Sequence, residues 1–230
     1  MISWIILTRC RPLFLRLAIR CFISQKTDEP KELVVVCDGD VEALSDPLVS
    51  IIQKYGQVVT CVGRATIGEK RNIGKRVSKG EFVFFADDDD WYSPGRVAAQ
   101  LPALRDGRAG VSVLQDSLSL DTESARYYSR IQDRVSDATI ACTRRAFEEA
   151  GGFAHRDHGE TEAFLGAALQ GKPGLALDQN QGEYIYMRHR SNITDAGIVF
   201  QDFCYRPEGR PDFFPADAEA AYCAAAKKGG

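Results

Sequence analysis

No run of about 18 apolar residues occurs in the chain, so no segment has the length that a membrane-spanning helix requires. Internal repeats, low-complexity segments and a large excess of basic residues are absent as well. The formal net charge of −3 over 230 residues argues against a strongly basic nucleic-acid-binding protein, although it leaves room for a local basic groove. With 44% hydrophobic and 27% charged residues, the composition indicates an ordinary soluble globular protein.

Cysteine is present, but not in a pattern that would build a site or a framework. The seven cysteines are odd in number, scattered, and form no C-x-x-C pair, which excludes the usual zinc and disulfide arrangements. We therefore expect buried, reduced thiols in a cytoplasmic protein. The first 26 residues carry basic side chains and no acid, as a transit peptide does. Arginines nevertheless interrupt any signal-like apolar core there, and Ile2–Leu7 has the composition of a strand.

An apolar run that stops at four carboxylates is the most distinctive stretch of the chain. Phe82–Phe85 do not alternate with polar residues, which indicates a strand buried on both faces. Asp87–Asp90 follow it, at the place where open α/β sheets bind their ligands. Adjacent carboxylates repel one another, and bound Mg²⁺ or Mn²⁺ would relieve that repulsion. An acidic surface loop is the alternative, but the buried lead-in favours a ligand site.

Strands and helices alternate before this stretch, which predicts an α/β fold with a parallel, doubly wound sheet. A capping box at Thr66–Glu69 starts a basic helix there. The other expected elements of the first half are strands at 2–7, 33–37 and 58–62 and helices at 13–24 and 46–55. After Pro94 we expect strands at 111–114, 138–143 and 184–189, a polar segment between the first two, and helices at 95–104, 144–150, 161–170 and 216–226.

Four motifs, in this order, resemble those of the family 2 glycosyltransferases: Cys37-Asp38-Gly39-Asp40, Lys70-Arg71-Asn72-Ile73-Gly74, Asp87–Asp90 followed by Pro94, and Gly151-Gly152-Phe153. The resemblance covers roughly residues 2–194. It implies a GT-A-type single domain with a Rossmann-like, mostly parallel central sheet flanked by helices. Residues 1–104 would form its nucleotide-sugar-binding half and 105–194 its acceptor-binding half, with 195–230 as a partly helical extension.

The resemblance also implies roles for individual residues, Mn²⁺ or Mg²⁺ as cofactor, and a UDP-sugar as the donor. A cation there would stabilise the charge that develops on the departing diphosphate. Asp87 and Asp89 match the Asp-x-Asp pair that holds a metal, and His189 in the Arg-His-x-x-Asn-like segment 188–192 joins them as a candidate ligand. The candidate donor contacts are Thr8, Arg11, Asp38, Lys70, Arg71, Asn72, Asp87 and Asp88.

The chain departs from the family pattern at the expected catalytic base. Thr161 stands where the family has an Asp, and a hydroxyl is hardly ionised near neutral pH. Glu160 and Glu162 lie beside it, but residues two apart on a helix point about 200° apart, so they cannot both face the donor. We favour Glu160 because it matches the Glu of the family pair, with Asp157 in reserve.

Three functions remain open at this point. The first is a metal-dependent enzyme that transfers a sugar, with inversion, to a hydroxyl of a saccharide or glycan, or of a hydroxymethylated DNA base on a basic surface. The second is a sugar-nucleotide nucleotidyltransferase, against which the absence of Gly from Thr8–Pro12 counts. The third is a non-catalytic nucleotide-sugar-binding module, which Thr161 keeps open. The arginines considered for a DNA surface are Arg126, Arg130, Arg134, Arg144 and Arg145.

Overall fold

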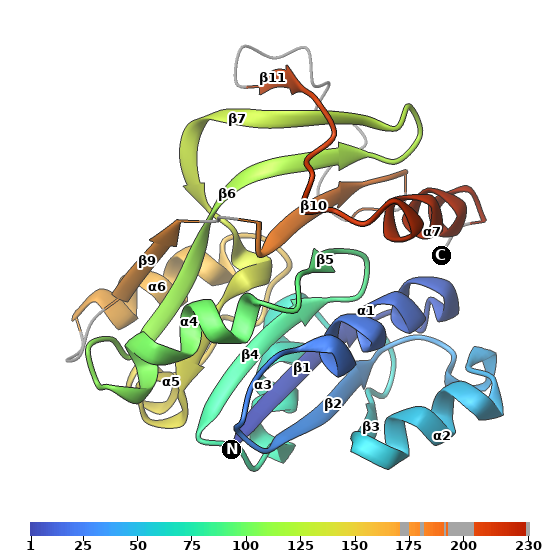
Figure 1. The fold of residues 1–230 in the computed structure, drawn as a ribbon. Coiled ribbons are helices and arrows are strands. Elements are labelled where there is room, and N and C mark those ends of the chain that lie inside the picture. Colours follow the sequence, from blue (N-terminus) through green and yellow to red (C-terminus); the bar gives the residue numbers. More distant parts are fainter. Residues whose placement is uncertain (171–174, 180–181, 191, 193–204, 229–230) are drawn as a thin grey trace.

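One twisted sheet runs through the molecule (Figure 1). The computed structural model describes residues 1–170, 175–179, 182–190, 192 and 205–228. Four parallel strands form one side of this sheet and lie in the spatial order β3, β2, β1, β4. Their bounds are β1 (Ile2–Thr8), β2 (Lys31–Cys37), β3 (Gly56–Thr60) and β4 (Phe82–Asp87). The expected α/β fold with a mostly parallel central sheet is confirmed.

The rest of the sheet is mixed. β8 (Ala141–Thr143) lies antiparallel to β4, and the long strand β6 (Val111–Asp121) lies next to β8. β6 also pairs with β7, β9 and β10, while β11 pairs with β7, and β10 with β5. The bounds of these remaining strands are β5 (Trp91–Tyr92), β7 (Arg126–Val135), β9 (Leu175–Gln179), β10 (Tyr184–Arg188) and β11 (Tyr205–Glu208).

Helices cover both faces of the sheet, which explains why its central strands are apolar throughout. Trp4 and Ile6 pack into the core on one face, whereas Ile5 and Leu7 pack into the core on the other. The first face carries α1 (Pro12–Ser24), α2 (Asp46–Tyr55) and α4 (Arg96–Arg105). The second face carries α3 (Ile67–Val77), α5 (Arg144–Glu149) and α6 (Glu160–Gln170). This layering places the carboxyl ends of β1, β2 and β4 at one rim of the sheet (Figure 1).

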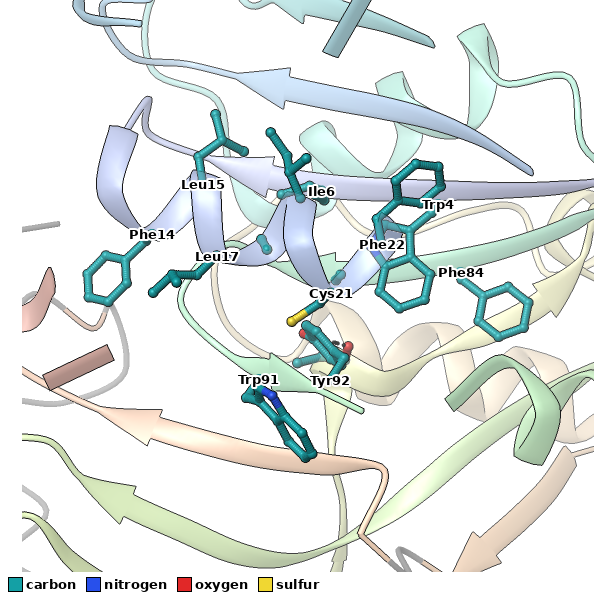
Figure 2. Packing of buried hydrophobic residues seen from close by; sticks show 14 of the residues in the cluster. Trp4, Ile6, Phe14, Leu15, Leu17, Cys21, Phe22, Phe84, Trp91 and Tyr92 are labelled. Carbon is teal, nitrogen blue, oxygen red and sulfur yellow. Dashed lines mark hydrogen bonds between the residues drawn. The ribbon is translucent and has the colours of Figure 1, made fainter. Parts of the chain in front are cut away.

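A buried arginine lies under that rim. Arg96 is fully buried, and its guanidinium lies 4.5 Å from the ring centre of Tyr92 and 4.8 Å from that of Trp4. Its Nη2 donates to the backbone carbonyl of Phe85 at 2.8 Å. Burial lowers the pKa of Arg96 to about 10, against the pull of neighbouring phenols and Asp87. Trp4 stacks on Phe84, and Figure 2 shows these rings beside α1 and the Trp91–Tyr92 strand.

The final helix, α7 (Ala216–Lys227), was expected at 216–226 and packs against α1. Among the described residues, no helix has both the length and the apolar character needed to cross a membrane. The helices expected near 13–24, 46–55, 95–104, 144–150 and 161–170 are likewise present.

Several strands differ from the expected pattern. The polar segment between 115 and 137 is the hairpin of β6 and β7, whose inward residues include Leu120 and Tyr127. β3 begins at Gly56 and ends at Thr60, two residues before the expected range of 58–62. Its register with β2 sets this shift, because a Cβ at Gly56 would lie 1.8 Å from the carbonyl oxygen of Leu33.

The expectation that all the thiols are reduced is wrong for one pair. Cys10 and Cys37 form a disulfide, with their Cα atoms 5.7 Å apart. The two cysteines are 27 residues apart in sequence, but they follow β1 and end β2, which are adjacent parallel strands. Cys21 and Cys142 are buried free thiols, as expected, and Cys61 and Cys223 are free and half-buried.

The disulfide predicts a specific labelling result. When the unfolded protein is alkylated with a light reagent, then reduced and alkylated with a heavy one, Cys10 and Cys37 should carry the heavy label and Cys142 the light one. Peptide mass spectrometry reads this directly. A light label on Cys10 in protein purified without reductant would show that the bridge does not form.

Candidate functional site

A pocket of about 570 Å³, including its open mouth, lies beyond the ends of β1 and β4. The parallel register pairs Leu7 with Asp87, so Thr8 and the carboxylates that follow β4 share one rim. The N-terminal turn of α3 closes another side through Ile67 and Lys70. The lining residues are Leu7, Thr8, Arg9, Arg11, Ile67, Lys70, Asp87, Asp88, Asp89, Tyr186 and Asn192.

Asp88 is bound by side chains from the loop after β1. Thr8 Oγ1 donates to its Oδ2 at 2.6 Å, and Arg11 Nε donates to the same oxygen at 3.2 Å. Arg11 Nη2 bonds the other carboxylate oxygen, so the guanidinium engages both. Burial raises the pKa of Asp88, although Arg11 opposes this shift. Three of the expected donor contacts therefore form one hydrogen-bonded cluster.

Asp89 joins that cluster to a histidine from a distant part of the chain. Its Oδ2 accepts from Arg11 Nη2 at 2.7 Å and lies 3.0 Å from His189 Nε2. The imidazole stacks on Phe14, with ring centres 4.6 Å apart, which fixes its plane. Burial alone would raise the pKa of Asp89, but Arg11 and His189 outweigh it and hold the pKa well below its usual value. Asp89 is therefore ionised at neutral pH.

The expected metal ligands are partly brought together. Asp89 and His189 are in contact, and Asp87 lines the same pocket. In the part of the chain that the structure describes, however, no three carboxylate, imidazole or thiol groups converge on one point. In this structure the guanidinium of Arg11 pairs with both Asp88 and Asp89 and supplies the positive charge between them. A carboxylate oxygen beside an imidazole nitrogen is nonetheless a donor set that suits Mn²⁺, so the residues present fit a cation if Arg11 turns away.

Asp87, like Asp88 and Asp90, is costly to ionise, but unlike them it shows no hydrogen bond to its carboxylate among the described residues. Burial raises its pKa to about 7, with Arg71 opposing and Asp89 reinforcing the shift. Its backbone N–H donates a hydrogen bond to the hydroxyl oxygen of Tyr92 at 2.9 Å. Asp87 lines the pocket, and the residue as a whole is half-buried.

The basic helix α3 sends successive residues to different places. Lys70 lines the pocket, and its Nζ lies 2.9 Å from Asp38 Oδ1, with both side chains almost fully buried. Arg71 does not line the pocket but donates to Glu160 Oε1 and Thr161 Oγ1, each at 2.8 Å. Asn72 binds the backbone of Phe153 in both directions. Asn72 therefore attaches α3 to the Gly-Gly-Phe turn rather than facing the pocket.

The three candidate bases occupy different environments. Glu160 is buried, and its Oε1 accepts from Arg71 and, at 3.0 Å, from the Thr161 hydroxyl. Glu162 lies on the exposed side of the first turn of α6. Asp157 accepts from the Ile67 backbone N–H at 3.0 Å and from Arg64 at 3.1 Å, so it caps the start of α3.

Sequence reasoning missed the partners of Asp90. Its Oδ2 accepts from the Tyr184 hydroxyl at 2.8 Å and its Oδ1 from the Met187 backbone N–H at 2.9 Å. Burial, reinforced by Asp89 and Asp87, raises its pKa well above the usual value. The strand β10 was expected, but its pairing with β5 was not. Because β5 follows Asp90 directly in the sequence, that pairing is what brings β10 into contact with Asp90.

Comparison with known proteins assigns this chain to a family. Residues 3–162 match the family model described as glycosyl transferase family 2. A stretch of 85 residues is 35% identical to an uncharacterized glycosyltransferase of Haemophilus influenzae, covering 36% of this chain and 27% of that protein. A stretch of 94 residues is 36% identical to a chondroitin synthase of Pasteurella multocida, covering 38% of this chain and 9% of that one. The matches thus span less than a third of either relative.

Solved structures share the fold. The chain superposes with a TM-score of 0.65 and 15% identity on S. aureus TarS residues 1–349 in complex with UDP-GlcNAc, covering 86% of this chain and 61% of TarS. For the mannosyltransferase PcManGT from Pyrobaculum calidifontis, in complex with GDP-Man and Mn²⁺, the TM-score is 0.56 at 16% identity, with coverages of 79% and 58%. Because the family model covers well over half of the chain, this protein belongs to glycosyl transferase family 2.

Proposed function

We propose that this protein transfers a sugar from a nucleotide diphosphate sugar, with UDP as the nucleotide, to an acceptor hydroxyl, with inversion and with the help of Mn²⁺ or Mg²⁺. The observation that carries the proposal is the pocket beyond β1 and β4, which is lined by three basic residues, Arg9, Arg11 and Lys70, and by three consecutive carboxylates. The TarS structures with UDP-GlcNAc and UDP support uracil as the base of the nucleotide.

The charges in the pocket suit a diphosphate. Lys70 offers an ammonium group whose position is fixed by its contact with Asp38, and Arg11 lines the same pocket with a guanidinium group. A divalent cation, when bound, would stabilise the negative charge of the departing diphosphate. Asp89 and His189 would hold that cation, with Asp87 as the third ligand. Arg11 would then keep its contact with Asp88 and leave Asp89.

The acceptor proton requires a base, and we propose Glu160 for that role. Arg71 and Thr161 both donate to its Oε1, so they orient the carboxylate and leave Oε2 for another partner. Thr161, at the position of the family's Asp, thus has a defined role beside Glu160. This arrangement favours an enzyme over a non-catalytic binding module. Asp157 is engaged at the start of α3, and Glu162 is the remaining candidate.

A saccharide or glycan is the acceptor that we favour, in keeping with the chondroitin synthase relative. A DNA acceptor has less support. Arg144 donates to the backbone carbonyls of Ser78 and Gly80, and Arg145 pairs with Glu149. These two arginines therefore serve local packing and pairing, while the side chains of Arg130 and Arg134 lie outside the described residues.

The metal assignment predicts that Asp89→Ala abolishes most Mn²⁺-dependent affinity for UDP. The variant removes an ionised carboxylate that contacts His189, so affinity should fall by at least about tenfold in calorimetry. Asp106→Ala, which removes an exposed acid just after α4, is the matched control and should bind like the wild type. Asp38→Ala should weaken UDP binding, because Lys70 loses its partner, but should keep the Mn²⁺ dependence. Unchanged affinity in Asp89→Ala would disprove the metal assignment.

The base assignment predicts that Glu160→Gln lowers the rate of sugar transfer by about 10²-fold, the usual scale for losing a general base. Donor affinity should stay near the wild-type value, because Glu160 does not line the donor pocket. UDP release from the donor in the presence of a glycan pool measures the rate, and Glu162→Gln is the control with a much smaller effect. A wild-type rate in Glu160→Gln would place the base elsewhere.

The raised pKa of Asp87 predicts a pH-dependent gain in stability for Asp87→Asn in the presence of EDTA. The folded protein holds this proton up to about pH 7, whereas the unfolded chain releases it near pH 4, so ionisation costs stability as the pH rises through this window. The variant avoids that cost, and its advantage should grow by about 2 to 3 kcal/mol between pH 5 and pH 8. Urea unfolding measures it, with the exposed Asp106→Asn as control. A gain that is equal at both pH values would contradict the environment described for Asp87.

A further inference from the structure

We propose that the C-terminal helix α7 positions the acidic loop for cation and donor binding, with Tyr222 as the positioning residue. The inference rests on the proposed function, but part of its test does not. The residues of α7 contain no functional motif, and their alanine-rich composition is typical of a simple packing helix. Its contacts nevertheless lead to the carboxylates beyond β4.

Tyr222 joins α7 to the acidic run through a backbone group. The residue is 1% exposed, and its hydroxyl donates to the backbone carbonyl of Asp90 at 2.7 Å. The same hydroxyl lies 3.8 Å from Cys21 Sγ on α1, which Figure 2 shows beside Tyr92. The phenol thus reaches through the contact between α1 and α7 to the loop that carries Asp89.

Asp90 connects this loop to the strand that carries the histidine. Its carboxyl group is bound by Tyr184 and by the Met187 backbone N–H, both on β10. His189 follows Met187 by two residues, and Asp89 precedes Asp90 directly. The contact of 3.0 Å between Asp89 and His189 therefore depends on how Asp90 is held. α7 holds the backbone of Asp90, and β10 holds its side chain.

A second set of contacts, which does not include Asp90, holds α7 against β7 and β5. Glu219 Oε2 accepts from the Tyr127 hydroxyl at 2.7 Å and lies 2.8 Å from Arg210 Nε. Before the helix, Phe214 packs edge-on against Trp91, with ring centres 5.0 Å apart. Tyr127 and Tyr222 thus each make a hydrogen bond of 2.7 Å to or from α7, but only the hydroxyl of Tyr222, which also contacts Cys21 Sγ, reaches the acidic loop.

This pair of tyrosines gives a matched test. In the full-length protein, Tyr222→Phe and Tyr127→Phe each remove one hydroxyl from a buried phenol that bonds at 2.7 Å. A purely structural role for α7 predicts similar losses of thermal stability and similar binding in the two variants. The positioning role predicts that Tyr222→Phe alone weakens Mn²⁺-dependent UDP affinity, by about tenfold, the scale of one buried hydrogen bond.

A readout without metal or nucleotide separates this inference from the proposed function. The protein has three histidines, so the ring resonances of His189 can be assigned by NMR. Its Nε2 resonance should shift in Tyr222→Phe and stay in place in Tyr127→Phe. If the wild-type protein binds no UDP, the proposed function fails and the His189 shift still decides the positioning role. An unshifted His189 resonance in Tyr222→Phe, or equal losses of affinity in both variants, would overturn the inference.

Discussion

Four consecutive carboxylates at the end of a buried strand must be neutralised for this fold to be stable, because an unpaired buried charge is expensive. Three of the four acids meet the requirement with defined partners. Asp88 takes Thr8 and Arg11, Asp89 takes Arg11 and His189, and Asp90 takes hydrogen-bond donors of β10. These partners come from the first loop and from the last third of the chain. The acidic run is therefore where distant parts of the sequence meet.

Asp87 differs from the three carboxylates that follow it in the way its side chain is held. The carboxylates of Asp88, Asp89 and Asp90 accept hydrogen bonds from defined side chains, whereas Asp87 lines the pocket and burial raises its pKa without such a bond among the described residues. A group that is costly to ionise in the free protein gains most from a cation brought by a ligand. In the free protein, the guanidinium of Arg11 compensates the negative charge of Asp88 and Asp89. The same residues thus explain both the stability of the free protein and its proposed affinity for a nucleotide diphosphate.

The first half of the fold was predictable because its signals are local. Pro12 begins α1, and the capping box at Thr66 begins α3. The apolar run Phe82–Phe85 predicts a buried strand that ends at the ligand-binding edge of the sheet. The family resemblance assigned Thr8, Arg11 and Asp88 to donor contacts and Asp89 to a metal, and the structure brings these four residues together. This part of the prediction depended on residues close in sequence or on parallel strands whose ends must meet.

What could not be predicted depends on pairings between distant segments. The polar residues of β7 look like a loop until their antiparallel partner β6 is known, and β5 is two residues long. The Cys10–Cys37 disulfide requires the β1–β2 register, and the separate directions of Lys70, Arg71 and Asn72 require the positions of Asp38, Glu160 and Phe153. The bond from Tyr222 to Asp90 spans 132 residues, and neither residue type indicates it.

A crystal structure of the protein with UDP and Mn²⁺, recorded with the anomalous signal of manganese, tests the central claim most directly. The account predicts an anomalous peak bonded to Asp89 and His189, with the diphosphate between that peak and Lys70 and with the Arg11 side chain turned away from Asp89. Arg11 still bonded to Asp89, with manganese and nucleotide bound elsewhere or absent at saturating concentrations, would contradict it.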